Sequence, residues 1–174
     1  LGLDCVSFDA YDKHEDLLVD SFFQQALRDI KAGVFAYVHF GLPCSTWSVM
    51  SRMNRGTRTK EAPRGDGTNE KETVANTLLD RVLVLVRAAQ EAGTLWTIEN
   101  PGTSYLWHDS ELNKLFDYGE VILVEFDQCA FALRALGNKE LYVKNTTRIL
   151  GIFDRLNTLA RRCARDHVHE VCLG

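Results

Sequence analysis

Long apolar runs are missing from this sequence: the longest uninterrupted ones are only as long as a β-strand. A transmembrane helix needs about 20 consecutive apolar residues, so we expect no membrane-spanning segment and no membrane partner. There is also no secretory signal peptide and no excess of positive charge, since the net charge is −4 at pH 7. The five cysteines are odd in number and scattered, unlike a disulfide framework. These absences predict an intracellular protein with reduced thiols, and its overall charge does not indicate a nucleic-acid partner.

What is present is the composition of a globular protein. Hydrophobic residues make up 45% and aromatic residues 10% of the 174 positions, enough for one domain with a full core. We therefore predict a single domain over residues 1–174. The chain begins at Leu1 rather than at a methionine, so we expect it to be part of a longer protein.

Strand-like and helix-like segments alternate along the chain. Short runs of branched and aromatic residues predict strands, and apolar residues spaced three or four apart predict helices. The predicted strands are 5–9, 34–40, 94–98 and 120–126, with 141–143 as a candidate partner of the last. The predicted helices are 20–32, 73–92, 109–116 and a basic helix 154–163 that opens the C-terminal tail 154–174. This alternation predicts an α/β protein with a doubly wound, mainly parallel sheet.

Two reactive side chains follow neighbouring predicted strands. Cys44 lies in the turn after 34–40, and Glu99 follows the strand 94–98. Pro43 fixes its own φ and restricts the residue before it, so the turn can aim the cysteine. Because parallel strands end at one edge of a sheet, we expect both side chains to face one ligand. A thiolate beside a carboxylic acid suits covalent attack on an electron-poor ring. The alternatives are a buried structural cysteine and a carboxylate that only caps a loop.

A basic segment follows the cysteine turn. Residues 51–72 are rich in Arg, Gly, Thr, Pro and Asn and are longer than an ordinary connection, so we expect a mobile loop that closes over a ligand. Basic side chains at positions 52, 55, 58, 60 and 64 accompany a single acid, Glu61. They can bind phosphates, or they can form an ordinary solvated basic surface.

Two motifs resemble those of the cytosine-5 DNA methyltransferases, within a resemblance that covers about residues 4–150. Pro43-Cys44 followed by Ser48 resembles the Pro-Cys motif of that family, and Glu99-Asn100 resembles its Glu-Asn motif. The order of the motifs and the strand–helix–strand spacing between them also agree. The resemblance implies a Rossmann-like methyltransferase fold, S-adenosylmethionine as methyl donor, and methyl transfer to C5 of cytosine in DNA. It also implies a nuclear protein if the source is eukaryotic.

The resemblance implies a role for each matching residue. Cys44 would add to C6 of a cytosine flipped out of its helix, Glu99 would protonate N3, and Asn100 would hold the cysteine turn. S-adenosylmethionine would be bound by Asp9 at its ribose, by Asp16 at its adenine, and by Pro43. The implied substrate-binding and remaining catalytic residues are Ser48, Arg52, Arg55, Arg58, Gln128 and Arg134. RNA stays open as a substrate, because the chemistry at the base would be the same.

The chain departs from the family pattern in three ways. Leu1-Gly2-Leu3 cannot supply the strand and the Phe-x-Gly-x-Gly cofactor turn that the family places before Asp9. We expect this missing first strand to be central in the sheet, and to be supplied by an upstream segment or by another chain. A third family motif is weak at Asp127-Gln128-Cys129. The segment 133–144 is too short for a region that reads a DNA sequence.

Two other functions are open. A methyltransferase-like domain without activity would serve as a structural or interaction subunit, which the missing cofactor turn favours and the retention of Cys44 and Glu99 opposes. Binding of S-adenosylmethionine separates this alternative from the enzyme. A cysteine hydrolase would pair Cys44 with a histidine, but no histidine has a clear partner role and Glu99 would be idle.

The C-terminal tail contains residue types that bind metals: Cys163, His167, His169 and Cys172. Cys163 and His167 are four residues apart and would share one face if the preceding helix continued. Two sulfurs and two imidazoles suit tetrahedral zinc, which would be structural here, with Cys129 as a substitute ligand. Nearby arginines would disfavour a cation, and the alternative is a frayed terminus with two packed cysteines.

Overall fold

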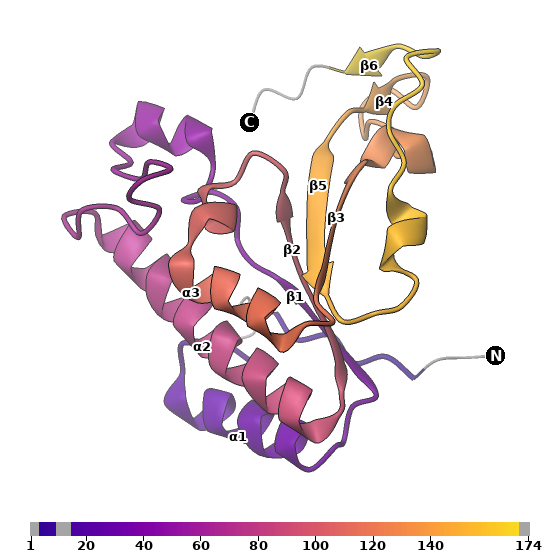
Figure 1. Cartoon of the computed structure of the whole chain (residues 1–174). Helices are drawn as coiled ribbons and strands as arrows, with labels where there is room; N and C mark the ends of the chain where they lie inside the picture. The colour runs from indigo at the N-terminus through magenta and orange to yellow at the C-terminus, as the bar shows by residue number, and fades with distance from the viewer. Residues whose placement is uncertain (1–3, 10–14, 171–174) are drawn as a thin grey trace.

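A computed structural model describes residues 4–9 and 15–170 of the chain. At the centre of these residues is a four-stranded sheet in the order β1-β2-β5-β3 (Figure 1). Its strands are β1 (Tyr37–Gly41), β2 (Leu95–Pro101), β3 (Ile122–Asp127) and β5 (Thr146–Gly151). β1 and β2 are parallel, whereas β5 is antiparallel to both of its neighbours, so β1, β2 and β3 all point in one direction.

The predicted α/β class is confirmed, but a doubly wound, mainly parallel sheet is not, because the described sheet is mixed. In the described part of the chain, the pairings of β5 with β2 and with β3 are both antiparallel. The sequence analysis missed β5 because its first half is polar. In the sheet these polar groups find partners: Gln128 Nε2 donates to Thr147 Oγ1 at 2.9 Å, and Arg148 forms an ion pair with Glu125.

Two further strand predictions are also wrong. Residues 4–9 form no strand. The segment 141–143 does not pair with β3; instead β4 (Tyr142–Val143) pairs with β6 (His169–Glu170) in a separate two-stranded sheet. β1 therefore lies at an edge of the described sheet, with its side chains exposed or only half-buried. A missing strand that covers this edge stays a prediction.

The long helices lie on one side of the sheet. α1 (Asp20–Lys31) packs on α2 (Glu70–Ala92), and α2 packs on the sheet (Figure 1). Asn69 begins α2 by accepting two backbone N–H groups on its side chain, and Gly93 ends it at a φ of 72°, a conformation that favours glycine. Apolar side chains of α2 meet Trp96, Ile98 and Leu150 in the core.

Short helices fill the connections. The predicted helix over 109–116 is present as α3 (Ser110–Asn113) followed by η3 (Lys114–Tyr118). The other short turns of 3₁₀ helix are η1 (Val49–Asn54), η2 (Tyr105–His108), η4 (Gln128–Phe131) and η5 (Leu156–Leu159). None of the helices in residues 4–9 and 15–170 combines the length and the hydropathy that crossing a bilayer requires.

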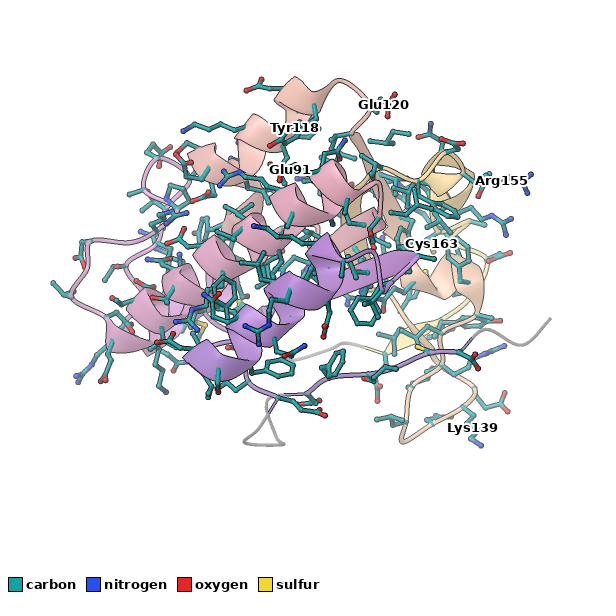
Figure 2. All side chains as sticks on the ribbon, turned by 90° about the horizontal axis from the view of Figure 1, so that it is seen from below. Glu91, Tyr118, Glu120, Lys139, Arg155 and Cys163 are labelled. Atoms are coloured by element: carbon teal, nitrogen blue, oxygen red, sulfur yellow. The ribbon has the colours of Figure 1, made fainter. Side chains whose placement is uncertain are left out.

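The segment between β5 and β6 has little regular structure, and the prediction of a helix over 154–163 is wrong. Only η5 forms in this segment, and Leu156 is the one buried residue of η5. A helix is stabilised mainly by an apolar stripe that packs against the core, and the polar, basic side chains of this segment do not provide one. Figure 2 labels Arg155 and Cys163 in this segment, together with Lys139 on an exposed loop between η4 and β4.

Candidate functional site

The cysteine turn begins where β1 ends. The backbone N–H groups of Trp47 and Ser48 donate to the Cys44 carbonyl at 3.1 and 2.9 Å and close the turn. Leu42 and Trp47 are buried, so the chain is anchored in the core on both sides of the turn. Cys44 itself is exposed and its thiol is free. The structure therefore argues against a buried structural role for Cys44.

Asn100 holds this turn from the neighbouring strand, as the sequence predicts. Its Nδ2 donates to the Leu42 carbonyl at 2.8 Å, and the side chain is fully buried. A second link follows shortly after β2, where the backbone N–H of Tyr105 donates to the Trp47 carbonyl at 2.9 Å. The buried amide and this backbone bond tie the cysteine turn to β2.

Glu99 lies at the same edge of the sheet as the cysteine turn. The residue opposite it on the parallel strand β1 is Gly41, three positions before Cys44. Alternation along β2 places Glu99 on the face opposite the core residues Trp96 and Ile98. Glu99 is half-buried, and within the described residues its carboxylate has no hydrogen-bond or ion-pair partner. Burial raises the pKa of this carboxyl group.

Replacing Glu99 by glutamine is expected to raise the melting temperature at neutral pH. Because the folded state has the higher pKa, stability falls as the pH rises from the ordinary glutamate value of 4.5 through the raised value. Glutamine carries no charge at any pH, so the Glu99→Gln protein should not lose stability over this pH range. Thermal melts between about pH 4 and 8 should show equal stability at the acid end and a more stable Glu99→Gln protein at neutral pH. Glu120→Gln, at an exposed position, is the matched control. Equal melting temperatures of Glu99→Gln and the wild type at neutral pH would contradict the prediction.

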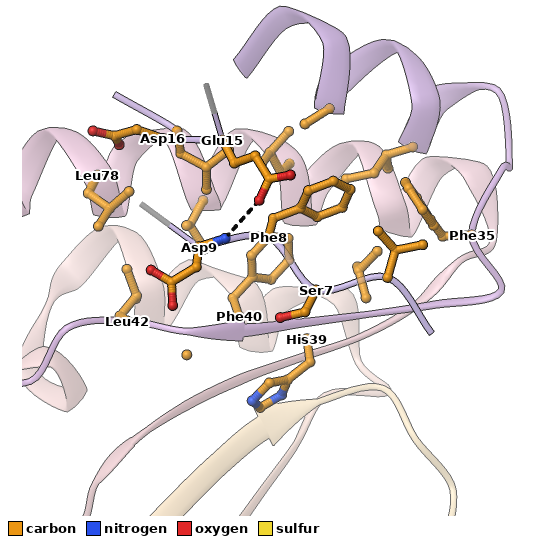
Figure 3. Close-up of a pocket in the computed structure, with 18 of the residues that line it drawn as sticks. Ser7, Phe8, Asp9, Glu15, Asp16, Phe35, His39, Phe40, Leu42 and Leu78 are labelled. Atoms are coloured by element: carbon orange, nitrogen blue, oxygen red, sulfur yellow. Dashed lines mark hydrogen bonds between the residues drawn. The ribbon is translucent and has the colours of Figure 1, made fainter. Parts of the chain in front are cut away.

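A cavity of about 640 Å³ lies along β1, between the N-terminal segment and helices α1 and α2 (Figure 3). The three predicted cofactor-binding residues, Asp9, Asp16 and Pro43, all line this cavity. Much of the remaining wall is apolar and includes Phe35, Val38, Phe40, Leu42, Leu78 and Val82. An apolar chamber of this size with a few polar groups is typical of a site for a small molecule.

Two polar residues of this cavity were missed by the sequence analysis. Glu15 Oε2 accepts the backbone N–H of Asp9 at 3.3 Å and ties the N-terminal segment to the chain that leads into α1 (Figure 3). His39 Nδ1 lies 2.8 Å from Thr97 Oγ1, and burial lowers the pKa of the imidazole. The signals were available: Glu15 precedes the predicted ligand Asp16, and His39 is a polar residue within an apolar strand.

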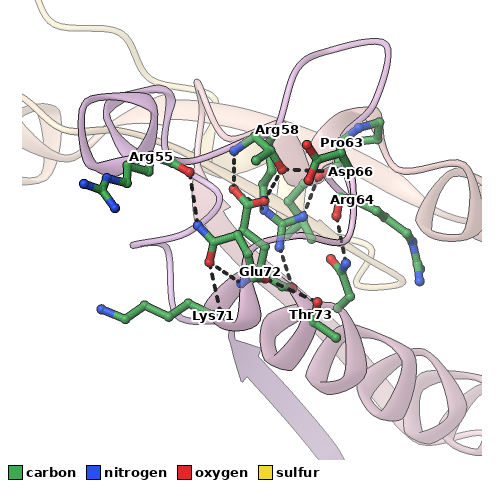
Figure 4. Close-up of polar contacts among 12 residues, drawn as sticks. Arg55, Arg58, Pro63, Arg64, Asp66, Lys71, Glu72 and Thr73 are labelled. Atoms are coloured by element: carbon green, nitrogen blue, oxygen red, sulfur yellow. Dashed lines mark hydrogen bonds and ion pairs between the residues drawn. The ribbon is translucent and has the colours of Figure 1, made fainter.

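Arg58 cannot contact a phosphate, contrary to the prediction, because its side chain is fully buried. Its guanidinium lies 3.5 Å from the centre of the Trp47 ring and donates to the carbonyls of Pro63 and Glu72 (Figure 4). Its Nε is 4.0 Å from a Glu72 carboxylate oxygen. The Glu72 carboxylate also accepts the backbone N–H and the hydroxyl of Thr57. Arg58 thus packs behind the cysteine turn as a structural residue.

The basic segment is also anchored after Arg58. Arg64 forms ion pairs with Asp109 at 2.6 Å and with Asp80 at 2.8 Å. Gly65 has a φ of 74°, and a Cβ there would lie 2.4 Å from a carboxylate oxygen of Glu72. These contacts do not support a mobile loop from position 57 onward. Arg52 and Arg55 on and after η1 are exposed, and their phosphate contacts stay a prediction.

Three other predicted residues have local roles in the structure. Ser48 Oγ accepts the backbone N–H of Met50 at 3.1 Å and caps η1. Gln128 donates to β5, as described above, at the end of β3. Arg134 lies over the ring of Tyr142, with 3.5 Å between the guanidinium carbon and the ring centre, and donates to its hydroxyl. These contacts leave the predicted roles in substrate binding and catalysis untested.

The predicted metal ligands Cys163, His167 and His169 come together in the tail, and the substitute ligand Cys129 joins them. Cys172 lies outside the described residues. Cys163 and His167 lie in an irregular segment, not on the helix face that the sequence analysis expected.

Similarity to known proteins adds nothing to this geometry, because no protein-family model, no curated protein and no solved structure matches this chain. A functional proposal therefore depends on three features of the molecule. They are the exposed Cys44 turn, the half-buried Glu99 on the adjacent strand, and the cavity along β1.

Proposed function

We propose that this protein transfers a methyl group from S-adenosylmethionine to C5 of cytosine in DNA through a covalent adduct on Cys44. One observation carries the proposal: an exposed thiol and a half-buried carboxyl group without a partner in the described residues lie at the same edge of two adjacent parallel strands. Addition of a nucleophile to an electron-poor ring needs these two groups together. The motifs Pro43-Cys44 and Glu99-Asn100 identify the ring as cytosine, by resemblance.

In the proposed reaction, the Cys44 thiolate adds to C6 and the ring electrons move toward N3. Glu99 in its protonated form donates its proton to N3, which leaves C5 nucleophilic. Burial raises the pKa of Glu99 and so favours the protonated form that this step needs. After methylation, loss of the C5 proton to a base expels the Cys44 thiolate, and N3 returns its proton to Glu99, which restores the neutral aromatic ring. The bonds that form and break in this reaction require no oxidant or reductant.

S-adenosylmethionine, when bound, supplies an electrophilic methyl group. The cavity along β1 fits such a ligand in part, because Asp9 and Asp16 offer carboxylates beside apolar walls and Pro43 joins the cavity to the cysteine turn. Asp16 Oδ1 already accepts the backbone N–H of Leu18 at 2.8 Å, which fixes the direction of that carboxylate. The sequence has no Gly-rich turn to donate backbone N–H groups to the ligand. We therefore expect the 174 residues alone to bind S-adenosylmethionine weakly or not at all.

The proposed nucleic-acid contact is local and not a property of the whole molecule, whose net charge is −4. Arg52 and Arg55 are exposed immediately after the cysteine turn, where they can contact phosphates on either side of a flipped base. RNA offers the same base and the same phosphates. DNA is proposed because of the family that the two motifs resemble.

The second candidate is a methyltransferase-like domain that binds a partner and has no activity. The observation in its favour is the open edge of β1, where Tyr37 is 47% exposed, together with Phe8 at 50% beside it. A segment or chain that pairs with this edge would bury these rings. The same segment would supply the missing cofactor turn if the enzyme is active.

Covalent trapping tests the proposed function. Protein that includes the missing strand and cofactor turn is incubated with S-adenosylmethionine and a DNA duplex that contains 5-fluorocytosine, whose fluorine cannot leave as the C5 proton does. We expect an adduct that survives denaturation and is absent with a duplex containing 5-methylcytosine. Binding of S-adenosylmethionine without an adduct would contradict the covalent mechanism. Neither binding nor an adduct would favour the inactive interaction domain.

A further inference from the structure

Four potential metal ligands converge near the two-stranded sheet of β4 and β6, just after the end of β3 and outside the proposed active site. One ligand atom from each residue lies within 4.8 Å of all the others, and the set is Cys129, Cys163, His167 and His169. They come from three separate parts of the chain: η4 after β3, the irregular segment after η5, and β6. Two sulfurs and two imidazole nitrogens are a donor set that zinc uses in structural sites.

The separations within the set match a tetrahedral centre. Cys163 Sγ is 3.3 Å from His169 Nε2 and 3.6 Å from His167 Nε2. With zinc–sulfur and zinc–nitrogen bonds of about 2.3 and 2.05 Å, a tetrahedron places sulfur and nitrogen about 3.6 Å apart. A zinc ion therefore needs only small movements of these side chains.

The groups around the ligands are those that orient a metal site. His167 presents Nε2 to the cluster while its Nδ1 lies 2.7 Å from an Asp166 carboxylate oxygen, the arrangement that fixes the ring of a metal-bound histidine. Arg165 has a φ of 61°, uncommon for a residue other than glycine, and its backbone N–H donates to Cys163 Sγ at 3.3 Å. This backbone conformation points the Arg165 N–H at the Cys163 sulfur, and a hydrogen bond from that N–H would stabilise a Cys163 thiolate.

The neighbouring arginines do not oppose a metal here. Arg162 forms an ion pair with Glu125 and lies 3.9 Å from an Asp127 oxygen, and Arg161 lies over the ring of Phe131. Two thiolates and two neutral imidazoles around Zn²⁺ give a centre with no net charge. The objection that basic residues would repel a cation therefore does not apply to the complete site.

This part of the chain has few buried apolar side chains of its own, among them Ala135 and Leu156. The main core cluster contains no residue after position 152 among those described. The large apolar side chains of this part are mostly exposed: Phe131, Leu133, Leu136 and Val168. Its strands β4 and β6 have two residues each. A two-residue strand pair with so few buried apolar side chains is marginal in water, so a cross-link is needed to hold these segments together.

The geometry points to a structural zinc site in which Cys129, Cys163, His167 and His169 are the four ligands. All four positions are filled by protein side chains, which leaves no open position for a substrate or a water. The zinc cross-links the end of β3 to the C-terminal segment and takes no part in chemistry at Cys44. This site is independent of the proposed methyl transfer.

Metal content tests the site directly. Protein purified without a histidine tag is analysed for zinc, and about one equivalent per chain is expected. Cys163→Ser and His169→Ala should lower this to below about a tenth of an equivalent, whereas Cys5→Ser, at an exposed cysteine far from the cluster in sequence, should keep it. Less than about a tenth of an equivalent in the wild type would overturn the proposal.

Cobalt substitution keeps the test decisive if the variants fail to fold. Wild-type protein in which Co²⁺ replaces zinc should show the strong visible absorption of a tetrahedral centre and a sulfur-to-cobalt charge-transfer band for two thiolates. A chelator should lower the melting temperature of the wild type, and added zinc should restore it. A Cys129–Cys163 disulfide in the purified protein, detected by mass spectrometry, would overturn the proposal, as would a cobalt spectrum without thiolate bands.

Discussion

In protein that includes the missing strand and cofactor turn, replacing Cys44 by serine is expected to reduce the proposed methyl transfer to cytosine by at least about 10³-fold, because the covalent step loses its thiolate. The fold should hardly change. Cys44 is exposed, and within the described residues its side chain makes no hydrogen bond that the substitution would remove. A surface substitution of this kind usually alters the free energy of unfolding by less than about 0.5 kcal/mol. A methyl-transfer assay and a thermal melt on the same samples check both parts of the prediction.

Two more variants separate loss of the nucleophile from damage to the fold. Cys44→Ala should be as inactive as Cys44→Ser and as stable as the wild type. Glu91→Gln changes an exposed side chain in the last turn of α2 and should leave turnover unchanged (Figure 2). Turnover retained by Cys44→Ser would rule out the covalent mechanism. Unfolding of both Cys44 variants would show that the thiol has a structural role after all.

The arrangement of the cysteine turn could be predicted because it depends on local patterns. A strand-length apolar run ending in Gly-x-Pro-Cys gives β1 and its turn, and the short run before Glu99 gives β2. Two consecutive strands joined by one helix are normally parallel, so the ends of both lie at one edge. The contact of Asn100 with the turn followed from the motif resemblance and not from the pattern.

The parts that could not be predicted depend on partners distant in sequence. β5 has a polar first half, and it becomes a central strand only because Glu125 and Gln128 provide partners for its side chains. Arg58 is in a segment rich in exposed polar residues, and nothing local shows that it would be buried. Its partner Glu72 lies fourteen positions later, in the first turn of α2.

The burial of Arg58 connects the basic segment to the proposed active site. Its guanidinium covers one face of Trp47, and the backbone of Trp47 bonds to the Cys44 carbonyl on one side and to Tyr105 on the other. Burial lowers the pKa of Arg58 to about 10, which still leaves it charged at neutral pH. The charge is compensated by Glu72 and by two carbonyl groups. Arg58 is therefore a positioning residue that supports the cysteine turn from behind.

Replacing Arg58 by alanine is expected to lower the free energy of unfolding by about 3–5 kcal/mol, because it leaves the buried Glu72 carboxylate without its counter-charge and a cavity beneath Trp47. Arg55→Ala removes an exposed arginine from the same segment and should cost less than about 0.5 kcal/mol. Urea unfolding of the two variants and the wild type measures the difference. Arg58→Ala combined with Glu72→Gln should recover part of the loss, because the double variant buries no unpaired charge. An Arg58→Ala protein as stable as Arg55→Ala would mean that the guanidinium is solvated and free to bind a phosphate, as the sequence alone predicts.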